Sequence, residues 1–217
     1  MANGKGNNIK FEVCRFWIMM GFSTISLAHK HIIQGRCMLA THQDAERRYE
    51  SLREMARNSI GNELPYTDRS NIHLRGICQK ALLQAKLWDN DPKRLVDWPW
   101  DSGYQDYSYR NPKRFELATW YGNTLAGLSL GRPSYAGTRL RLEFIESRPS
   151  SSPLKGRIVP ITISVAELYA NIIGADELRI IDPVDQKLVE YYTSFGYRYK
   201  TAVSEKNHKH YLVKAIL

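Results

Sequence analysis

Apolar residues recur with a helical period in the first part of the chain. One stripe in residues 42–60 predicts a helix that Gly61 ends, and its members are Tyr49, Leu52, Met55, Ala56 and Ile60. Residues 68–88 carry a similar stripe and predict another helix, and residues 9–40 predict one or two more. We therefore expect residues 1–90 to form a helical N-terminal segment, either separate from the rest or integral to the same domain.

The second part of the chain instead alternates short apolar runs with turn residues. Residues 115–122 and 124–131 predict an antiparallel hairpin that turns at Gly122–Asn123. A helix is predicted over residues 159–173. Further strands are predicted at residues 139–146, 177–182, 197–203 and 210–217. We expect an α/β fold of mixed α+β type, in which residues 91–217 form a mixed, mostly antiparallel sheet of about six or seven strands with flanking helices.

The charge and composition of the chain favour anionic partners and argue against disulfides, a metal site and membrane contact. There are 31 Lys and Arg against 22 Asp and Glu, a net charge of +9 that would attract RNA, a protein partner or the phosphates of a cofactor. The three cysteines lie far apart in the sequence and form no C-x-x-C motif, which favours a protein of a reducing compartment over one with disulfides or a zinc site. No metal site is expected. The apolar stretch at residues 16–28 is shorter than a membrane span, so we expect a cytoplasmic protein without membrane contact.

The stretch from Arg139 to Tyr199 predicts a strand, a loop, a helix, a second strand and a short helix, which together contain one βαβ unit. Its loop carries Lys155 and Arg157 on either side of Gly156, and glycine lets the backbone approach an anion closely. The positive end of the following helix points at the same place. This arrangement predicts a binding site for a phosphate-bearing cofactor.

Two motifs in this region resemble those of the GNAT superfamily, the acyl-CoA-dependent N-acyltransferases. The family loop Gln/Arg-x-x-Gly-x-Gly/Ala is similar to Pro153-Leu154-Lys155-Gly156-Arg157-Ile158, in which Gly156 matches the first glycine. Pro153 and Ile158 depart from the pattern. The family motif Ala-x-x-Leu/Phe-Tyr-Glu-Lys-Leu-Gly-Phe is similar to residues 188–197 and matches its tyrosine with Tyr192. The resemblance extends over residues 93–217.

This resemblance implies roles for particular residues and acetyl-CoA as the co-substrate. The CoA pyrophosphate would be held by the loop residues Leu154, Lys155, Gly156, Arg157 and Ile158. Tyr192 would donate a proton to the departing CoA thiolate, since a phenol with a pKa of about 10 is protonated at neutral pH. A backbone amide between Ile145 and Ser147, where the fourth strand splays from the fifth, would polarise the thioester carbonyl.

An attacking amine must also lose a proton, and several carboxylates are candidates for the base. Glu143 and Glu146 are two of them, and their three-residue offset predicts that they lie on opposite faces of the strand. Glu116 on the preceding hairpin is a third, and a chain of water molecules is an alternative to all three.

The expected function is N-acetyl transfer to an amine acceptor, which is an aminoacyl-tRNA (as for toxin-like members), a protein amine or a small molecule. The alternative is a catalytically inactive GNAT-fold protein that binds nucleic acid or a protein partner. An aromatic and basic run either contacts the acceptor or covers the sheet: Trp98, Trp100, Tyr104, Tyr107, Tyr109, Arg110, Lys113 and Arg114. The N-terminal helices would shape the acceptor site or form a homodimer or partner-chain contact.

Overall fold

The computed structural model describes residues 30–96, 98–201 and 210–216, with side chains from His42 onward. The chain divides into two compact units, Met1–Leu39 and Ala40–Leu217. Helix α1 (Lys30–Glu63) begins in the first unit and ends in the second. Helices were predicted over residues 9–40, and the part of this range up to residue 29 lies outside the described residues. The apolar stretch at residues 16–28 lies outside them as well.

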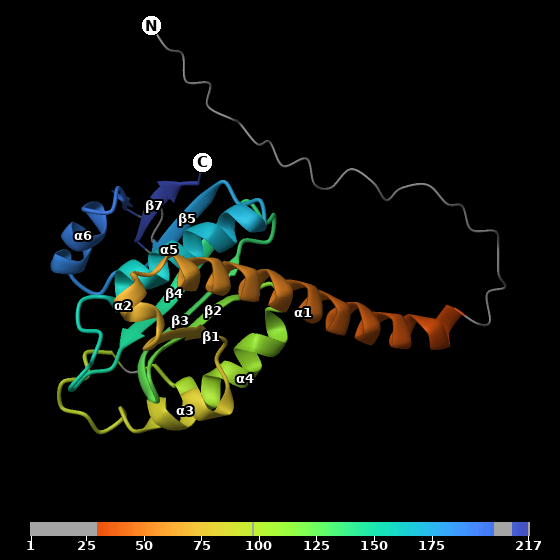
Figure 1. The fold of residues 1–217 in the computed structure, drawn as a ribbon. Helices are drawn as coiled ribbons and strands as arrows, with labels where there is room; N and C mark the ends of the chain where they lie inside the picture. Colours follow the sequence, from red (N-terminus) through yellow and green to blue (C-terminus); the bar gives the residue numbers. More distant parts are fainter. Residues whose placement is uncertain (1–29, 97, 202–209, 217) are drawn as a thin grey trace, which may run out of the picture. The chain divides into compact units, whose positions relative to one another are not determined.

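The second unit is built on one seven-stranded sheet with the order β1-β2-β3-β4-β5-β7-β6 (Figure 1). The strands are β1 (Ile72–Arg75), β2 (Phe115–Tyr121), β3 (Thr124–Pro133), β4 (Arg139–Ser147), β5 (Glu177–Ile181), β6 (Arg198–Lys200) and β7 (Tyr211–Ala215). Every neighbouring pair is antiparallel except β4 and β5, which are parallel. The predicted mixed, mostly antiparallel sheet is therefore confirmed. The predicted boundary near residue 90 stays a prediction.

Helices cover both faces of this sheet (Figure 1). They are α2 (Tyr66–Arg69), α3 (Gln79–Lys86), α4 (Trp100–Arg110), α5 (Ile158–Ile172) and α6 (Gln186–Thr193). On one face, α5 packs in a single apolar cluster with Ala56 of α1 and Tyr192 of α6. On the other face, α3 and α4 form a second cluster with Trp88 and Trp120. None of the described helices combines the length and hydrophobicity that a membrane crossing requires.

The single helix predicted over residues 68–88 is wrong, because α2, β1 and α3 occupy this range. Ile72 belongs to the cluster under α5, whereas Ile77 belongs to the cluster under α3. The apolar positions that suggested one helical stripe therefore serve opposite faces of the sheet. Ile72 lies in β1 and Ile77 follows the strand, so the chain crosses from one face of the sheet to the other between them.

The helix predicted over residues 42–60 is confirmed as part of α1, but the predicted stop at Gly61 is wrong. The helix runs on to Glu63. A glycine inside a helix costs only about 1 kcal/mol relative to alanine, so it does not end a helix by itself. Most of the predicted stripe packs against the core, but Met55 is 54% exposed.

The predicted hairpin is confirmed, with Gly122 at the turn and a φ of +56° that glycine adopts without strain. Strand β4 is paired with β3 but carries one extra residue. Leu130 pairs with Phe144 and Gly131 pairs with Leu142, so Glu143 is a bulge with no partner of its own in this ladder.

Replacing Gly131 by alanine is expected to lower the free energy of unfolding by about 1–3 kcal/mol. A Cβ atom there would overlap the carbonyl oxygen of Arg141 and lie 3.1 Å from Cα of Leu142, and both are backbone atoms that cannot rotate away. Urea denaturation followed by circular dichroism measures the change. Gly61→Ala is the control, since a Cβ there meets nothing within 4 Å, and it should raise stability by about 0.5–1 kcal/mol. Equal stabilities of the two variants would contradict the prediction.

Candidate functional site

The candidate site lies where β4 and β5 part. Their pairing ends at Leu142 and Ile180 among the described residues, although β4 continues to Ser147. A cavity of about 590 Å³ lies between the diverging strands, the loop that precedes α5 and the side of α6. The predicted splaying of the fourth strand from the fifth is thus present, and it creates the space for a ligand.

Most of the predicted site residues line this cavity. They are Glu143, Ile145, Glu146, Ser147, Lys155, Gly156 and Tyr192. Three loop residues do not line it. Leu154 and Ile158 are buried in the core beneath α5, and Arg157 forms an ion pair with Asp68 at 2.7 Å. The predicted roles of these three in cofactor binding stay predictions, and the charge of Arg157 already has a partner.

The direction of the β4 amides follows from the ladder with β3. The N–H of Arg148 donates to the carbonyl of Ala126 at 2.8 Å, and Ser147 lies opposite Gly127. In an antiparallel strand, successive residues direct their backbone groups to alternate sides. The N–H groups of Ile145 and Ser147 therefore point away from β3, toward the gap left by β5.

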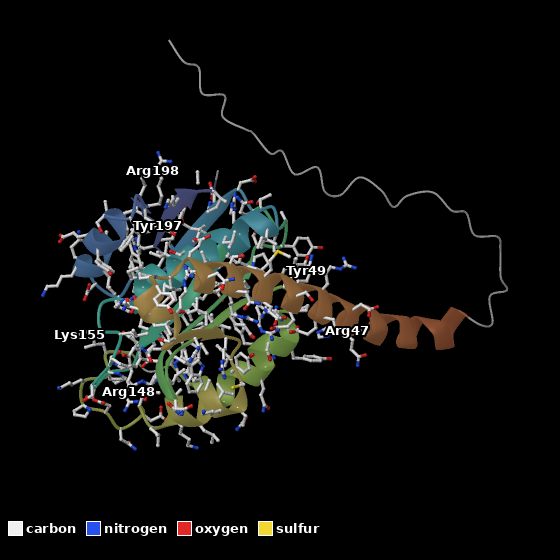
Figure 2. All side chains as sticks on the ribbon, viewed as in Figure 1. Arg47, Tyr49, Arg148, Lys155, Tyr197 and Arg198 are labelled. Carbon is white, nitrogen blue, oxygen red and sulfur yellow. The ribbon has the colours of Figure 1, made fainter. Side chains whose placement is uncertain are left out.

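The loop after β4 is built to leave backbone and hydroxyl groups at the cavity. Gly156 has a φ of +75°, and a Cβ there would meet nothing within 4 Å. The hydroxyl of Tyr191 donates to the Gly156 carbonyl at 3.4 Å. The Oγ of Ser152 is buried at the cavity without a hydrogen-bond partner among the described residues. Figure 2 shows Arg148 and Lys155, both of which line the cavity, on the same side of the molecule.

Tyr192 is 4% exposed and lines the cavity from α6. Burial raises its pKa, and the neighbouring Tyr191 adds to this effect. Burial has this direction because it disfavours the charged phenolate. The hydroxyl of Tyr192 therefore keeps its proton at neutral pH, which is the state that a proton donor needs.

Glu146 is held in a buried ion pair. Its Oε1 accepts from Nε of Arg94 at 2.7 Å, and its Oε2 accepts from Nε1 of Trp100 at 2.6 Å. The side chains of Arg94 and Glu146 are 6% and 4% exposed. The hydrogen bond that Arg94 donates to Glu146 is the main cause that raises the pKa of Arg94. Both carboxylate oxygens thus accept hydrogen bonds, which tie β4 to the loop before α4, and the predicted role of Glu146 as a base stays a prediction.

Glu143 lies on the same face of β4 as Glu146, so the predicted placement on opposite faces is wrong. Tyr107 of α4 donates to Glu143, at 3.0 Å, and α4 also supplies the Trp100 partner of Glu146. The extra residue at the bulge reverses the alternation between these two positions. Glu143 also contacts Arg132 and Arg141, each at 3.2 Å.

Glu116, the third candidate base, does not line the cavity. Its Oε2 accepts from Nε of Arg114 and from the hydroxyl of Tyr104, both at 2.6 Å, and its side chain is buried. This carboxylate belongs to an ion-pair network that joins β2 to α1 through Glu46, which accepts from Arg114 at 2.8 Å.

The aromatic run mainly covers the sheet. Phe144 of β4 makes edge contacts with Trp98, Trp100 and Tyr107, and Tyr109 stacks on His42. Trp98 differs because it also lines the cavity, where its Nε1 is buried without a partner among the described residues. Ser152 and Arg94 were not predicted as site residues, and the sequence signal for α4 was the spacing of Trp100, Tyr104 and Tyr107 on one side of a helix.

Neither a family model nor a curated protein matches the sequence. Solved structures do match the fold. Ard1 from Thermoplasma volcanium has a TM-score of 0.54 at 11% identity, covering 68% of this chain and 99% of its own. A protein from Desulfovibrio desulfuricans assigned to the GNAT family of acetyltransferases has a TM-score of 0.52 at 10% identity, covering 67% and 99%. An aminoglycoside 6'-N-acetyltransferase complexed with coenzyme A has a TM-score of 0.51 at 14% identity, covering 66% and 97%. The sheet order, the parted strands β4 and β5 and these likenesses together show that the chain has the GNAT fold.

Proposed function

We propose that this protein transfers an acetyl group from acetyl-CoA to an amine acceptor. The observation that carries the proposal is the cavity between β4 and β5, because it joins the amides of Ile145 and Ser147 to the loop around Gly156 and to the hydroxyl-bearing ring of Tyr192. Structural neighbours with this fold include acetyltransferases, one of them complexed with coenzyme A.

The loop residues fit a CoA diphosphate. Gly156 is unobstructed, Lys155 adds a positive charge, and the Oγ of Ser152 lacks a partner among the described residues. Helix α5 begins at Ile158, so its positive end lies next to this loop. Because a buried hydroxyl without a partner is costly, a phosphate oxygen at Ser152 would remove that cost.

The remaining groups fit the chemistry of acyl transfer. Acetyl-CoA, when bound, supplies an acetyl thioester. The outward amides of Ile145 and Ser147 are placed to donate to an oxyanion that develops on the thioester carbonyl. Tyr192 holds a proton at Oη, which it donates to the thiolate that leaves.

The amine acceptor enters from the α3–α4 side, where Trp98 lines the cavity. The Nε1–H of Trp98, which has no partner among the described residues, would donate to an oxygen of the acceptor. Of the two predicted bases that line the cavity, Glu143 is the better candidate, since its side chain is 12% exposed and Glu146 is enclosed by Arg94 and Trp100. The net charge of +9 makes aminoacyl-tRNA one of the acceptors to test, beside protein amines and small amines.

Replacing Gly156 by aspartate is expected to weaken acetyl-CoA binding at least about tenfold, because the carboxylate repels phosphate and occupies the open approach. Isothermal titration calorimetry measures the affinity. Gly137→Asp is the matched control, since Gly137 has a similar φ of +76° and equally open surroundings in the turn between β3 and β4. It should bind like the unmodified protein.

Two outcomes would contradict the proposal. One is that the unmodified protein does not bind acetyl-CoA at millimolar concentration, which would favour the GNAT-fold binding protein. The other is that both variants bind as tightly as the unmodified protein. Incubation with acetyl-labelled acetyl-CoA and separate RNA, protein and small-amine fractions then identifies the acceptor by the fraction that gains the label.

A further inference from the structure

A second cavity of about 570 Å³ lies along β1, and it shares no lining residue with the cavity between β4 and β5. Its walls come from α1, from the last residue of α2 and from five consecutive residues that comprise β1 and the residue after it. The lining residues are Glu54, Arg57, Asn58, Gly61, Asn62, Arg69, Ile72, His73, Leu74, Arg75 and Gly76. Side chains of consecutive strand residues point to opposite faces of the sheet. Contact with all five therefore places the cavity at the edge of the strand, and we call it the edge groove.

Strand β1 is one of the two edge strands of the sheet and is paired on one side with β2. The carbonyl of Asn71 accepts from the N–H of Gly122 at 2.7 Å, so Asn71 directs its backbone groups to β2. By alternation, the N–H and C=O groups of Ile72 and Leu74 point away from β2, into the edge groove. No strand of the described residues pairs with this edge, and an unpaired strand edge of this kind is a template for pairing with another extended chain.

The edge groove also contains a buried cation with an unused donor. Arg57 is 5% exposed, and its Nη2 donates to Oε1 of Glu50 at 2.5 Å. Its Nη1 is buried without a hydrogen-bond partner among the residues that the structure describes. A Cβ on Gly76 would lie 3.7 Å from this Nη1 and 2.9 Å from Oε1 of Glu116, so the glycine leaves a gap beside the guanidinium that the Glu116 carboxylate borders. Leaving such a donor unpaired costs stability that a ligand oxygen would restore.

The charge along the edge groove favours an acidic ligand. Arg57, Arg69 and Arg75 line it against one carboxylate, Glu54. The side-chain amides of Asn58 and Asn62, one helical turn apart on α1, add further hydrogen-bonding groups opposite the strand.

We propose that the edge groove binds an extended acidic segment of another protein as an eighth strand beside β1. The backbone of the segment pairs with Ile72 and Leu74, and a glutamate or aspartate of the segment accepts from Nη1 of Arg57. A small anion would use the arginines but leave the strand edge unpaired, whereas an acidic strand uses both features.

The test uses the full chain and a fluorescein-labelled peptide, Ser-Thr-Val-Glu-Val-Thr-Ser with an amidated C-terminus. Fluorescence anisotropy should show saturable binding. Replacing the peptide glutamate by glutamine should weaken binding at least about tenfold. Arg57→Gln should weaken binding of the glutamate peptide by a similar factor and leave the affinity for the glutamine peptide unchanged. Because these comparisons include changes made only in the peptide, the proposal is testable even if Arg57→Gln does not fold.

Two further measurements decide whether the peptide binds as a strand. Two peptides are compared, one N-methylated at the glutamate and the other at the valine that follows it. One of the two methylations should reduce binding at least about tenfold and the other should not, since only alternate amides face β1. Hydrogen exchange at the amides of Ile72 and Leu74 should slow when the peptide is added. The proposal is overturned by absence of saturable binding, by equal binding of both methylated peptides, or by a dimer of this chain that already protects these amides without peptide.

Discussion

Replacing Glu146 by leucine is expected to lower the free energy of unfolding by about 3–5 kcal/mol. The substitution removes the carboxylate that accepts from Arg94 and Trp100, and it leaves both donors in a buried site. Asp89 and the carbonyl of Trp98 still accept from Arg94, so the charge keeps part of its network. Urea denaturation followed by circular dichroism gives the change directly.

Two control variants distinguish the effect of breaking the buried ion pair from the effect of removing a charged side chain anywhere on the protein. The double variant Arg94→Met with Glu146→Leu should recover much of the lost stability, because an apolar pair can replace a buried ion pair of similar volume. Arg110→Gln breaks an exposed pair with Asp106 and should cost less than about 1 kcal/mol. A loss below about 1 kcal/mol for Glu146→Leu would mean that the ion pair does not hold the loop before α4.

The part of the fold that was predictable from sequence is the part where local signals and tertiary structure agree. The hairpin has a glycine at its turn, and α5 has an apolar stripe that ends before Gly174, which has a φ of +74°. Helix α4 was not predicted, because its sequence contains Gly103 and several aromatic residues with modest helix propensity. Packing of Trp100 against the sheet stabilises it instead.

The candidate site was likewise predictable only where a local sequence motif marked it. The loop glycine and the aromatic motif placed Gly156 and Tyr192, and both line the cavity. The positions of the carboxylates were not predictable, because a single extra residue at Glu143 changes which face of β4 they share. The partners Arg94 and Asp68 come from segments far from β4 and α5 in sequence, and no spacing rule connects them.

Replacing Tyr192 by phenylalanine is expected to lower turnover by roughly ten- to a thousandfold, with little change in acetyl-CoA affinity. The ring that packs in the cavity is kept and only the Oη–H group is lost. Because burial raises the pKa of Tyr192, the proton stays on Oη throughout the neutral range. The turnover number of the unmodified protein divided by that of Tyr192→Phe should therefore be constant from about pH 6 to 9. A rise of this ratio with pH would instead indicate that Tyr192 acts as a phenolate base.

The matched control is Tyr191→Phe, since Tyr191 is the neighbour on α6 and its hydroxyl donates to the Gly156 carbonyl over a long 3.4 Å. Losing so weak a hydrogen bond should change turnover less than about threefold. Release of the CoA thiol in the presence of the acceptor identified by labelling measures turnover, and calorimetry measures affinity in the same preparations. Equal turnover of Tyr192→Phe and the unmodified protein would remove Tyr192 from the acid role. A parallel loss of affinity and turnover would show that the hydroxyl binds the co-substrate in its ground state, because only an interaction made in the transition state lowers turnover alone.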